Sequence, residues 1–375
     1  MDTAPLTSTT ARRMRVRSHL LTGSALTPGQ VVERAVALQG QNLGAVLEAI
    51  ALRARPGTTV ADVREAFDRG ELVRSWPMRG TLFATTPRDL ATLLHVTGPR
   101  ILRATSTRRA GLGIDDTTIA RAWDVLGEAL SRGPLPRARV MELWESCAIP
   151  TGGGVGYHLL MHLAVAGHVH WGAFDPAGTG QLLTLSPAVA PTDPEASLVE
   201  VVGRYVRARG PVTEADLAWW SKLPRRLLRH ALAGVEGLVE VEVDGTRALL
   251  VVEDADPCAD SAVRHAPTLP DPPASGVVLL PAFDEWVLGY ADRSLVASPA
   301  MTRGLAPGGN GVFRPVVVVD GRIVGTWTRR PGRRDAAGGV DVDLVEEVPP
   351  RVRTEIERIA RHAVTRRGPF SSPST

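Results

Sequence analysis

GPVTEADLAWW at residues 210–220 decides the fold, because GPLPRARVMELW at residues 133–144 repeats its plan. Both stretches open with a Gly-Pro-apolar turn, enter a short helix that ends in tryptophan, and follow an apolar run with helical spacing. Glycine permits a sharp reversal between two helices, and Thr213 can cap the second one, as a helix-turn-helix requires. A pattern that recurs at this length predicts repeated modules.

Each stretch is followed by a further helix and two strands. After the second stretch, apolar spacing predicts a helix over 225–233. The alternating residues 238–243 then turn at Asp244-Gly245 into a strand over 247–252. The matching elements after the first stretch are a helix over 158–166 and strands over 168–174 and 181–185. A helix-turn-helix followed by such a hairpin is a winged helix.

The N-terminal third shows the same order without the Gly-Pro turn. Its expected elements are helices over 28–38, 44–54 and 59–68 and strands over 71–75 and 80–85. Beyond about residue 262 the expected elements are strands over 277–280, 316–319 and 322–327 and one amphipathic helix over 352–364.

We therefore predict an α+β fold of three tandem winged-helix modules, each a helix-turn-helix with a β-wing, followed by a small β-rich C-terminal domain with a closing helix. The predicted boundaries are 1–27 for a basic N-terminal arm or helix, 28–110, 111–192 and 193–262 for the winged helices, and 263–375 for the last domain, with a disordered tail from Arg366.

The composition indicates a globular protein of the cytoplasm. Hydrophobic residues make up 44% of the 375 residues, and no apolar run approaches the length of about 20 that a membrane helix needs. The N-terminus has no apolar signal-peptide core. Cys147 and Cys258 lack the spacing of a zinc site, so we expect no metal and no cofactor. We expect a monomer that is associated with the nucleoid and needs neither a membrane nor a protein partner.

The charge favours nucleic acid as the partner. The net charge is +3, and Lys222 is the only lysine among the 43 basic residues. Arginine suits phosphate oxygens and guanine edges better than lysine does. The clusters expected to contact DNA contain Arg12, Arg15, Arg108, Arg109, Arg225 and Arg226. Each cluster taken alone also fits an ordinary solvated surface.

Three other groups of residues are interpreted as structural. They are the histidines His158, His162, His168 and His170, the aspartates Asp284 and Asp292, and the tryptophans Trp76, Trp171, Trp219 and Trp220. No carboxylate or cysteine completes a metal set with the histidines. The aspartates fit turns and salt bridges, and the tryptophans fit the core.

The segment Gln39-Gly40-Gln41 lies where the first expected helix ends. On a continuous helix, two residues at i and i+2 point about 200° apart, so the two amides would not meet. We expect Gly40 to be a left-handed C-cap, after which Gln39 and Gln41 converge and hold one water. The competing interpretation is that one glutamine caps the helix and the other is solvated.

The chain resembles the AlkZ family of bacterial DNA glycosylases, also called YcaQ-like, from residue 13 to about residue 330. The segments that carry the resemblance are VALQGQ at 36–41, MRGTL at 78–82, GPVT at 210–213 with LAWWS at 217–221, LLPAFD at 279–284 with ADRS at 291–294, and VDGRIVGTW at 319–327.

This resemblance implies a winged-helix enzyme in which Gln39 and Gln41 are the catalytic side chains. Arg79 and Thr81 lie at the turn of the first expected wing, where a winged helix touches the flanking phosphates or the minor groove, so we expect both to contact the DNA. Two positions depart from the family pattern: Gly40 stands where a larger apolar residue is usual, and Phe83 stands where histidine is frequent.

The implied chemistry suits a cationic base. A glutamine amide can orient a water but cannot take its proton, so it fits a leaving group whose glycosidic bond is already weak. N7-alkylguanine and N3-alkyladenine are such leaving groups. We therefore expect a monofunctional glycosylase for alkylated purines in double-stranded DNA. Bulky adducts or interstrand crosslinks are further candidate substrates, in DNA repair or in self-resistance to a DNA-alkylating natural product.

Two alternatives stay open at this stage. One is a non-enzymatic winged-helix transcriptional regulator that reads a sequence through a recognition helix, although such regulators usually act as two-fold dimers. The other is a structural DNA-binding protein whose ancestral site has decayed. An assay for abasic sites in alkylated DNA separates both from an enzyme.

Overall fold

The computed structural model describes residues 4–178, 180–187, 191–252, 276–308, 311–329 and 339–362. Helices and strands are mixed throughout, which confirms the α+β class. Within these ranges no helix has the length and apolar character that crossing a bilayer demands. The expected boundary at 262, Cys258 and the tail from Arg366 lie outside the described residues.

The N-terminal third contains a helix, a short strand, two helices and a hairpin. These are α2 (Pro28–Ala35), β2 (Ala37–Gln39), α3 (Leu43–Arg53), α4 (Val60–Asp68), β3 (Val73–Met78) and β4 (Thr81–Thr85). Asn42 caps α3, and Thr59 forms a capping box with Asp62 at the start of α4.

The expected helix over 28–38 is too long. Val36 has a left-handed φ of 66° and ends α2 after Ala35. Residues 37–39 then pair antiparallel with β4, from Ala37 opposite Thr85 to Gln39 opposite Phe83. A short apolar run can be helix or strand by its periodicity, and here the pairing with β4 decides for the strand.

The same order of elements occurs twice more. The second set is α7 (Asp116–Ser131), β5 (Leu135–Pro136), α8 (Arg137–Ser146), α9 (Val155–Val165), β6 (Val169–Phe174) and β7 (Gln181–Leu185). The third is α10 (Pro194–Arg209), α11 (Glu214–Ser221), α12 (Arg225–Ala233), β8 (Leu238–Val243) and β9 (Thr246–Val251). In the third set a single bridge between Val212 and Leu249 replaces the short strand, and Thr213 caps α11 as predicted.

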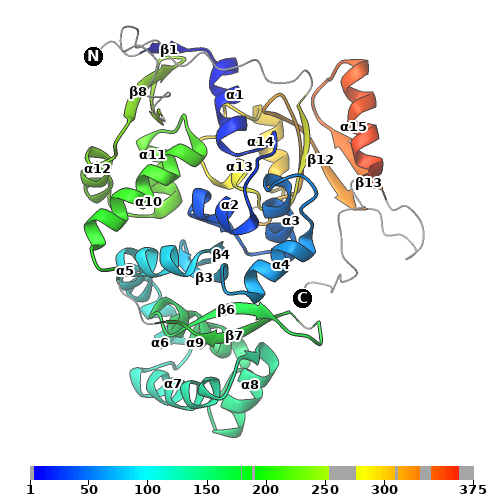
Figure 1. Cartoon of the computed structure of the whole chain (residues 1–375). Coiled ribbons are helices and arrows are strands. Elements are labelled where there is room, and N and C mark those ends of the chain that lie inside the picture. Colours follow the sequence, from blue (N-terminus) through cyan, green and yellow to red (C-terminus); the bar gives the residue numbers. More distant parts are fainter. Residues whose placement is uncertain are drawn as a thin grey trace.

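One sheet joins the first two sets, which the sequence did not indicate. Its strand order is β2-β4-β3-β6-β7-β5, and β3 meets β6 at Arg74 opposite Trp171. Two helices, α5 (Pro87–Ala104) and α6 (Ser106–Gly111), connect the two sets, and a 3-10 turn (Gly152–Gly154) precedes α9. The N-terminal β1 (Ala4–Leu6) pairs in parallel with β8, and α1 (Ser8–Ser18) follows it (Figure 1).

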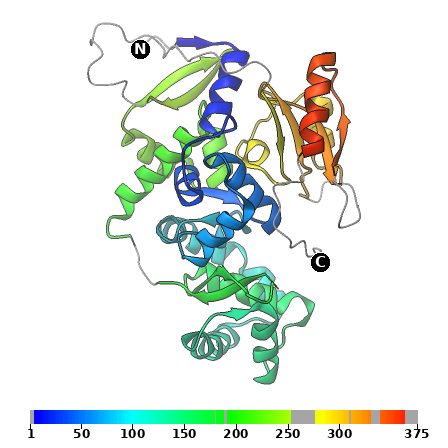
Figure 2. The ribbon, with the colours of Figure 1, turned by 45° about the vertical axis from the view of Figure 1, so that its right-hand side comes forward.

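The C-terminal part packs beside the first and third sets, and Figure 2 shows its sheet and last helix in yellow to red. It contains β10 (Val277–Leu280), α13 (Glu285–Leu288), α14 (Pro299–Leu305), β11 (Val316–Val319), β12 (Arg322–Arg329), β13 (Val340–Leu344) and α15 (Pro350–His362). The four strands form an antiparallel sheet in chain order. The short α13 contacts β2, and its Trp286 and Val287 also pack in the core of the C-terminal part.

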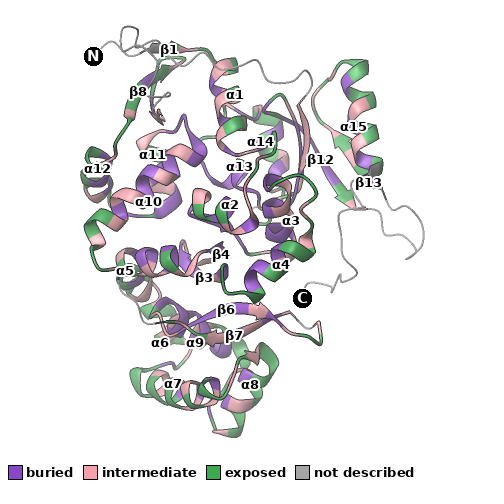
Figure 3. Cartoon of the chain, in the orientation of Figure 1, coloured by how far each residue is buried: buried purple, intermediate pink, exposed green. Residues whose placement is uncertain are grey.

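Buried residues concentrate where β3, β4 and α13 meet the helices of the first and third sets (Figure 3). A buried ion pair fixes α13 to α3 at this junction. Arg53 Nη2 lies 2.7 Å from Asp284 Oδ1, and Arg53 Nη1 lies 2.9 Å from Asp284 Oδ2. Asp284 also caps α13 by accepting from the peptide N–H of Trp286. The interpretation of Asp284 as a structural residue is confirmed.

We expect Asp284→Asn to lower the free energy of unfolding by about 3 kcal/mol, because the buried Arg53 keeps its charge and loses its counter-ion. The measurement is denaturant unfolding of Asp284→Asn, with Asp292→Asn as the control. Asp292 accepts from the peptide N–H of Ser294, and an asparagine oxygen can still do so. Equal losses in the two variants would show that the Arg53 pair has no special role.

Candidate active site

The candidate site is built on β2 and the residue after it. Gly40 donates its N–H to Leu82 O at 2.7 Å, which continues the pairing of β2 with β4. Gly40 does not have a left-handed φ, so its predicted role as a C-cap is wrong. A Cβ at this position would lie 3.0 Å from Ala84 N, 3.1 Å from Phe83 C and 3.2 Å from Arg74 Cδ. The glycine instead allows the two strands and the Arg74 side chain to approach closely.

Gln39 and Gln41 both turn their side chains to the hairpin segment 79–82. Gln39 is 7% exposed, and its Oε1 accepts from Arg79 Nη2 at 3.1 Å and from Thr81 Oγ1 at 3.4 Å. Gln41 is exposed, and its Oε1 accepts from the N–H of Leu82 at 3.3 Å. The structure therefore brings together four of the residues that the sequence analysis singled out.

The partners fix which way each amide faces. A guanidinium and a peptide N–H can only donate, so both glutamines must present oxygen to the hairpin and nitrogen away from it. The Gln39 oxygen already accepts two hydrogen bonds, which uses both of its lone pairs. The Gln41 oxygen accepts one from a described residue. Gln39 can therefore act as a donor, and Gln41 as both a donor and an acceptor.

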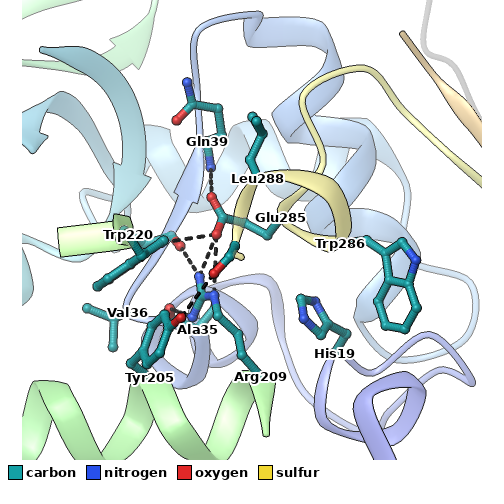
Figure 4. A network of polar contacts seen from close by, with 12 residues as sticks. His19, Ala35, Val36, Gln39, Tyr205, Arg209, Trp220, Glu285, Trp286 and Leu288 are labelled. Carbon is teal, nitrogen blue, oxygen red and sulfur yellow. Dashed lines mark hydrogen bonds and ion pairs between the residues drawn. The ribbon is translucent and has the colours of Figure 1, made fainter. Parts of the chain in front are cut away.

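Glu285 holds the backbone of Gln39 from the other side (Figure 4). This carboxylate is 2% exposed at the start of α13. Its Oε1 accepts from the peptide N–H of Gln39 at 3.2 Å. Its Oε2 accepts from Arg209 Nη2 at 2.9 Å and from Trp220 Nε1 at 3.1 Å. The charge of Glu285 is thus compensated inside the protein.

Arg209 binds the chain on both sides of Val36. Its Nη1 donates to Ala35 O and its Nη2 to Ala37 O, each at 3.0 Å. The guanidinium also stacks over the rings of Tyr205 and Trp220 at 4.9 Å and 4.8 Å from the centroids. The left-handed end of α2 is therefore held by a buried cation from the end of α10.

The second set of elements reaches the site through Arg74. Arg74 Nη1 donates to Gly40 O at 2.9 Å, and its Nε donates to Gln181 Oε1 at 2.7 Å. Gln181 is held in turn by Gly172 O, at 3.0 Å from its Nε2. Burial lowers the pKa of Arg74 to about 10. The backbone between the two glutamines is therefore fixed to the β6–β7 hairpin.

Arg79 is at the hairpin turn, as predicted, but its side chain points inward. Its φ is 55°, and the following Gly80 has a φ of 68°. The guanidinium lies 4.8 Å from the ring centroid of Trp219, and Nη1 donates to Leu288 O at 3.2 Å. Burial lowers the pKa of Arg79, and Glu285 acts in the opposite direction. Arg79 thus holds Gln39 instead of extending from the turn.

Two further cations surround Trp219. Lys222 Nζ lies 5.3 Å and Arg293 Cζ 5.5 Å from the centroid of its ring. Trp219 is only partly buried, whereas Trp76, Trp171 and Trp220 are in the core as predicted. Nothing in the sequence connects Trp219, Lys222 and Arg293 with the site, because they meet Arg79 only through the tertiary fold.

The other predicted DNA contacts lie elsewhere. Arg15 is 5% exposed, donates to Pro211 O and stacks on Tyr290, so the prediction of a surface contact is wrong for this residue. Arg12 and Arg109 are partly buried, and Arg108, Arg225 and Arg226 are exposed. None of these five contacts Gln39 or Gln41, and as DNA contacts they stay predictions.

The four histidines have structural surroundings. His168 stacks on Trp123 at 4.3 Å between centroids, and His170 Nδ1 lies 2.9 Å from Ser186 Oγ. Burial lowers the pKa of His162 and of His170 to about 4, so both are neutral near pH 7. Among the described residues no three His, Cys, Asp or Glu side chains gather as a metal site.

Comparison with known proteins defines the class of this fold and site. The family model described as DNA glycosylase AlkZ-like matches residues 32–362. The chain belongs to the AlkZ-like DNA glycosylase family, and the resemblance seen in the sequence is confirmed. It is accordingly an enzyme that hydrolyses glycosidic bonds in DNA.

Similarity to Streptomyces sahachiroi proteins is found both in sequence and in structure. An interstrand DNA cross-link repair glycosylase is 28% identical over 314 residues, which cover 79% of this chain and 81% of the relative. The solved structure of the DNA glycosylase AlkZ matches with a TM-score of 0.75 at 22% identity, over 97% of this chain and 99% of that chain. The second match supports the overall fold.

We expect Gly40→Ala to lower the single-turnover glycosylase rate about tenfold, because the added Cβ must push β2 away from β4 and displaces both amides. The matched control is Gly152→Ala, since a Cβ there meets nothing within 4 Å. Comparing the two rate constants at saturating enzyme checks the prediction. An unchanged rate in Gly40→Ala would mean that the site tolerates the displacement.

Proposed function

We propose that this enzyme is a monofunctional glycosylase that releases cationic alkylated purines, N7-alkylguanine and N3-alkyladenine, from double-stranded DNA. The observation that carries the proposal is that Gln39 and Gln41 both turn their side-chain amides to the hairpin segment 79–82. Only Arg79, Thr81 and Leu82 make hydrogen bonds to the two side-chain amides among the described residues. None of these partners is a general base or an amine nucleophile, so the pair can orient a water but not deprotonate it.

The reaction that fits these groups is simple hydrolysis. Water attacks C1′ of the sugar, the C1′–N bond breaks, and its electron pair neutralises the positive charge of the departing base. The proton of the attacking water goes to solvent. No covalent intermediate with the protein forms, and the strand is not cleaved. A cationic base leaves without being protonated, which is why a neutral site suffices.

The two amides have different capacities in this reaction. Gln41 Oε1 has a lone pair left to accept a hydrogen from the attacking water, which turns the water's own lone pair toward C1′. Gln39 has only its Nε2 hydrogens to offer, because Arg79 and Thr81 occupy its oxygen. We assign water orientation to Gln41 and a donated hydrogen bond to Gln39.

Carboxylate substitutions test this division. Gln41→Glu keeps the acceptor and should retain at least a third of the single-turnover rate. Gln39→Glu removes the donor and should lower the rate by about 100-fold, since general orientation by one polar group contributes roughly this much. The measurement is base release from methylated duplex DNA, with DNA affinity determined for each variant.

The alanine variants are the reference for that comparison. Both Gln39→Ala and Gln41→Ala should release base slowly. Both should bind DNA as the unmodified enzyme does, because neither amide contacts the DNA backbone in the proposed mechanism. If Gln39→Glu and Gln41→Glu lose activity equally, the division of roles is wrong. Full activity in both alanine variants would reject the proposed function itself.

Substrate preference provides an independent test. N7-methylguanine and a bulky N7-alkylguanine should both be released, whereas uracil in a matched duplex should be released at least 100-fold more slowly, because two amides cannot protonate a neutral base. Comparable release of uracil would require a stronger acid or base than the site holds. The comparison uses single-turnover rates on otherwise identical duplexes.

We also propose that the three repeated sets of elements are winged-helix modules that surround one duplex, with the enzyme acting as a monomer. The recurring order of helix, strand or bridge, two helices and hairpin supports this. Arg108, Arg225 and Arg226 are exposed and suit contacts with phosphates. Arg12, Arg109, Arg79 and Thr81 remain weaker candidates, since each is partly buried.

Interstrand crosslinks are proposed as further substrates, in DNA repair or in self-resistance to a DNA-alkylating natural product. Two observations support this extension. A relative is an interstrand DNA cross-link repair glycosylase. In addition, Gln41 is exposed, so the water-orienting group lies at the surface, where an adduct joined to the second strand can approach. A regulator is not favoured, because the family consists of DNA glycosylases.

A further inference from the structure

We infer that Glu285 is a positioning residue of this glycosylase, because its carboxylate fixes the peptide N–H of Gln39 and thereby the Gln39 amide. The inference rests on the catalytic role proposed for Gln39. Glu285 lies 246 residues after Gln39 in the sequence, and its side chain contacts Gln39 at the peptide N–H. It therefore acts through Gln39 and not on the DNA.

The strand β2 is an edge strand. It pairs with β4 on one side, and no strand among the described residues pairs with its other side. In an antiparallel pair, alternate residues direct both backbone groups away from the partner strand. On this open edge, Gln39 N donates to Glu285 and Ala37 O accepts from Arg209. Two side chains thus take the place of the missing strand.

Only a carboxylate satisfies all the donors at this point. Glu285 Oε2 faces the donors of Arg209 and Trp220, and Oε1 faces the N–H of Gln39. A glutamine here would turn its one oxygen toward Arg209 and Trp220, where more donors gather. Its NH₂ group would then oppose the N–H of Gln39, and donor against donor is repulsive.

The residues after Gln39 have anchors that do not involve Glu285. Gly40 is held at its N–H by Leu82 O and at its carbonyl by Arg74. Gln41 is held by the N–H of Leu82. Loss of the Glu285 contact is therefore felt more at Gln39 than at the residues that follow it. A displacement of about 1 Å at a reacting group can cost roughly 100-fold in rate.

A matched control is available away from α13. Asp89 and Arg204 form another ion pair inside the protein, with side-chain exposures of 2% and 12% against 1% and 1% for Glu285 and Arg209. The Asp89 carboxylate accepts from Arg204 Nη1 at 2.9 Å and has no hydrogen bond to β2 or α13 among the described residues. Asp89→Asn should therefore lower the stability, as Glu285→Gln does, without the effect of Glu285→Gln on catalysis.

The experiment measures single-turnover base release from N7-methylguanine duplex, DNA affinity, and hydrogen exchange in residues 36–41. Glu285→Gln should lower the rate 10- to 100-fold, leave the dissociation constant within threefold, and accelerate exchange at Gln39. Asp89→Asn should leave the rate within threefold and exchange in this segment unchanged. Equal rate losses in the two variants would overturn the inference, because the effect would then be general destabilisation.

A second comparison shows whether Glu285 acts through Gln39. Adding Glu285→Gln to Gln39→Ala should lower the remaining rate by less than threefold, because the amide to be positioned is already absent. A loss as large as in the unmodified enzyme would overturn the inference. Failure of the proposed function would give a different result: Gln39→Ala alone would release base at the rate of the unmodified enzyme.

Discussion

The backbone of a buried edge strand must find hydrogen-bond partners, and this constraint organises the molecule around β2. An unpaired buried N–H or C=O costs about 1–3 kcal/mol, so the open edge of β2 cannot be left empty inside the protein. Glu285 comes from the C-terminal part and Arg209 from the third set of elements. Filling the edge therefore brings both of them against the first set, where the two glutamines lie.

The second set of elements contacts the same segment of the chain through Arg74. The β3–β6 pairing places Trp171 opposite Arg74, and Arg74 extends to Gly40 while Gln181 holds it in place. A contact from each part of the chain thus ends on residues 35–41. The candidate site is a junction and not the property of one module, so substitutions in distant elements are able to change catalysis without touching DNA.

Local signals in the sequence predict local structure well. Residues 225–233 and 238–243 have the bounds that the spacing indicates, and Thr213 caps its helix because capping needs only neighbouring residues. The family resemblance also singles out Gln39 and Gln41 as candidate site residues.

Predictions that depend on distant partners fail. The apolar spacing over 28–38 fits a helix, and β2 forms within this range only because β4 pairs with it. Arg15 lies in a basic cluster of the sequence, but Pro211 and Tyr290 cover its side chain in the fold. Nothing near Glu285 in the sequence indicates that it meets Gln39.

The unequal burial of the two glutamines follows from this arrangement and suits the chemistry. Gln39 is fixed at its backbone by Glu285 and at its amide by Arg79 and Thr81, so it is a rigid donor. Gln41 is exposed and has one hydrogen bond to a described residue, so its side chain can adjust while Leu82 limits its direction. In the proposed mechanism, a rigid donor beside an adjustable acceptor keeps one reference point for the sugar and lets the water position follow the lesion. On this proposal, adducts of different size are hydrolysed without rebuilding the site, since the part that must move is already at the surface.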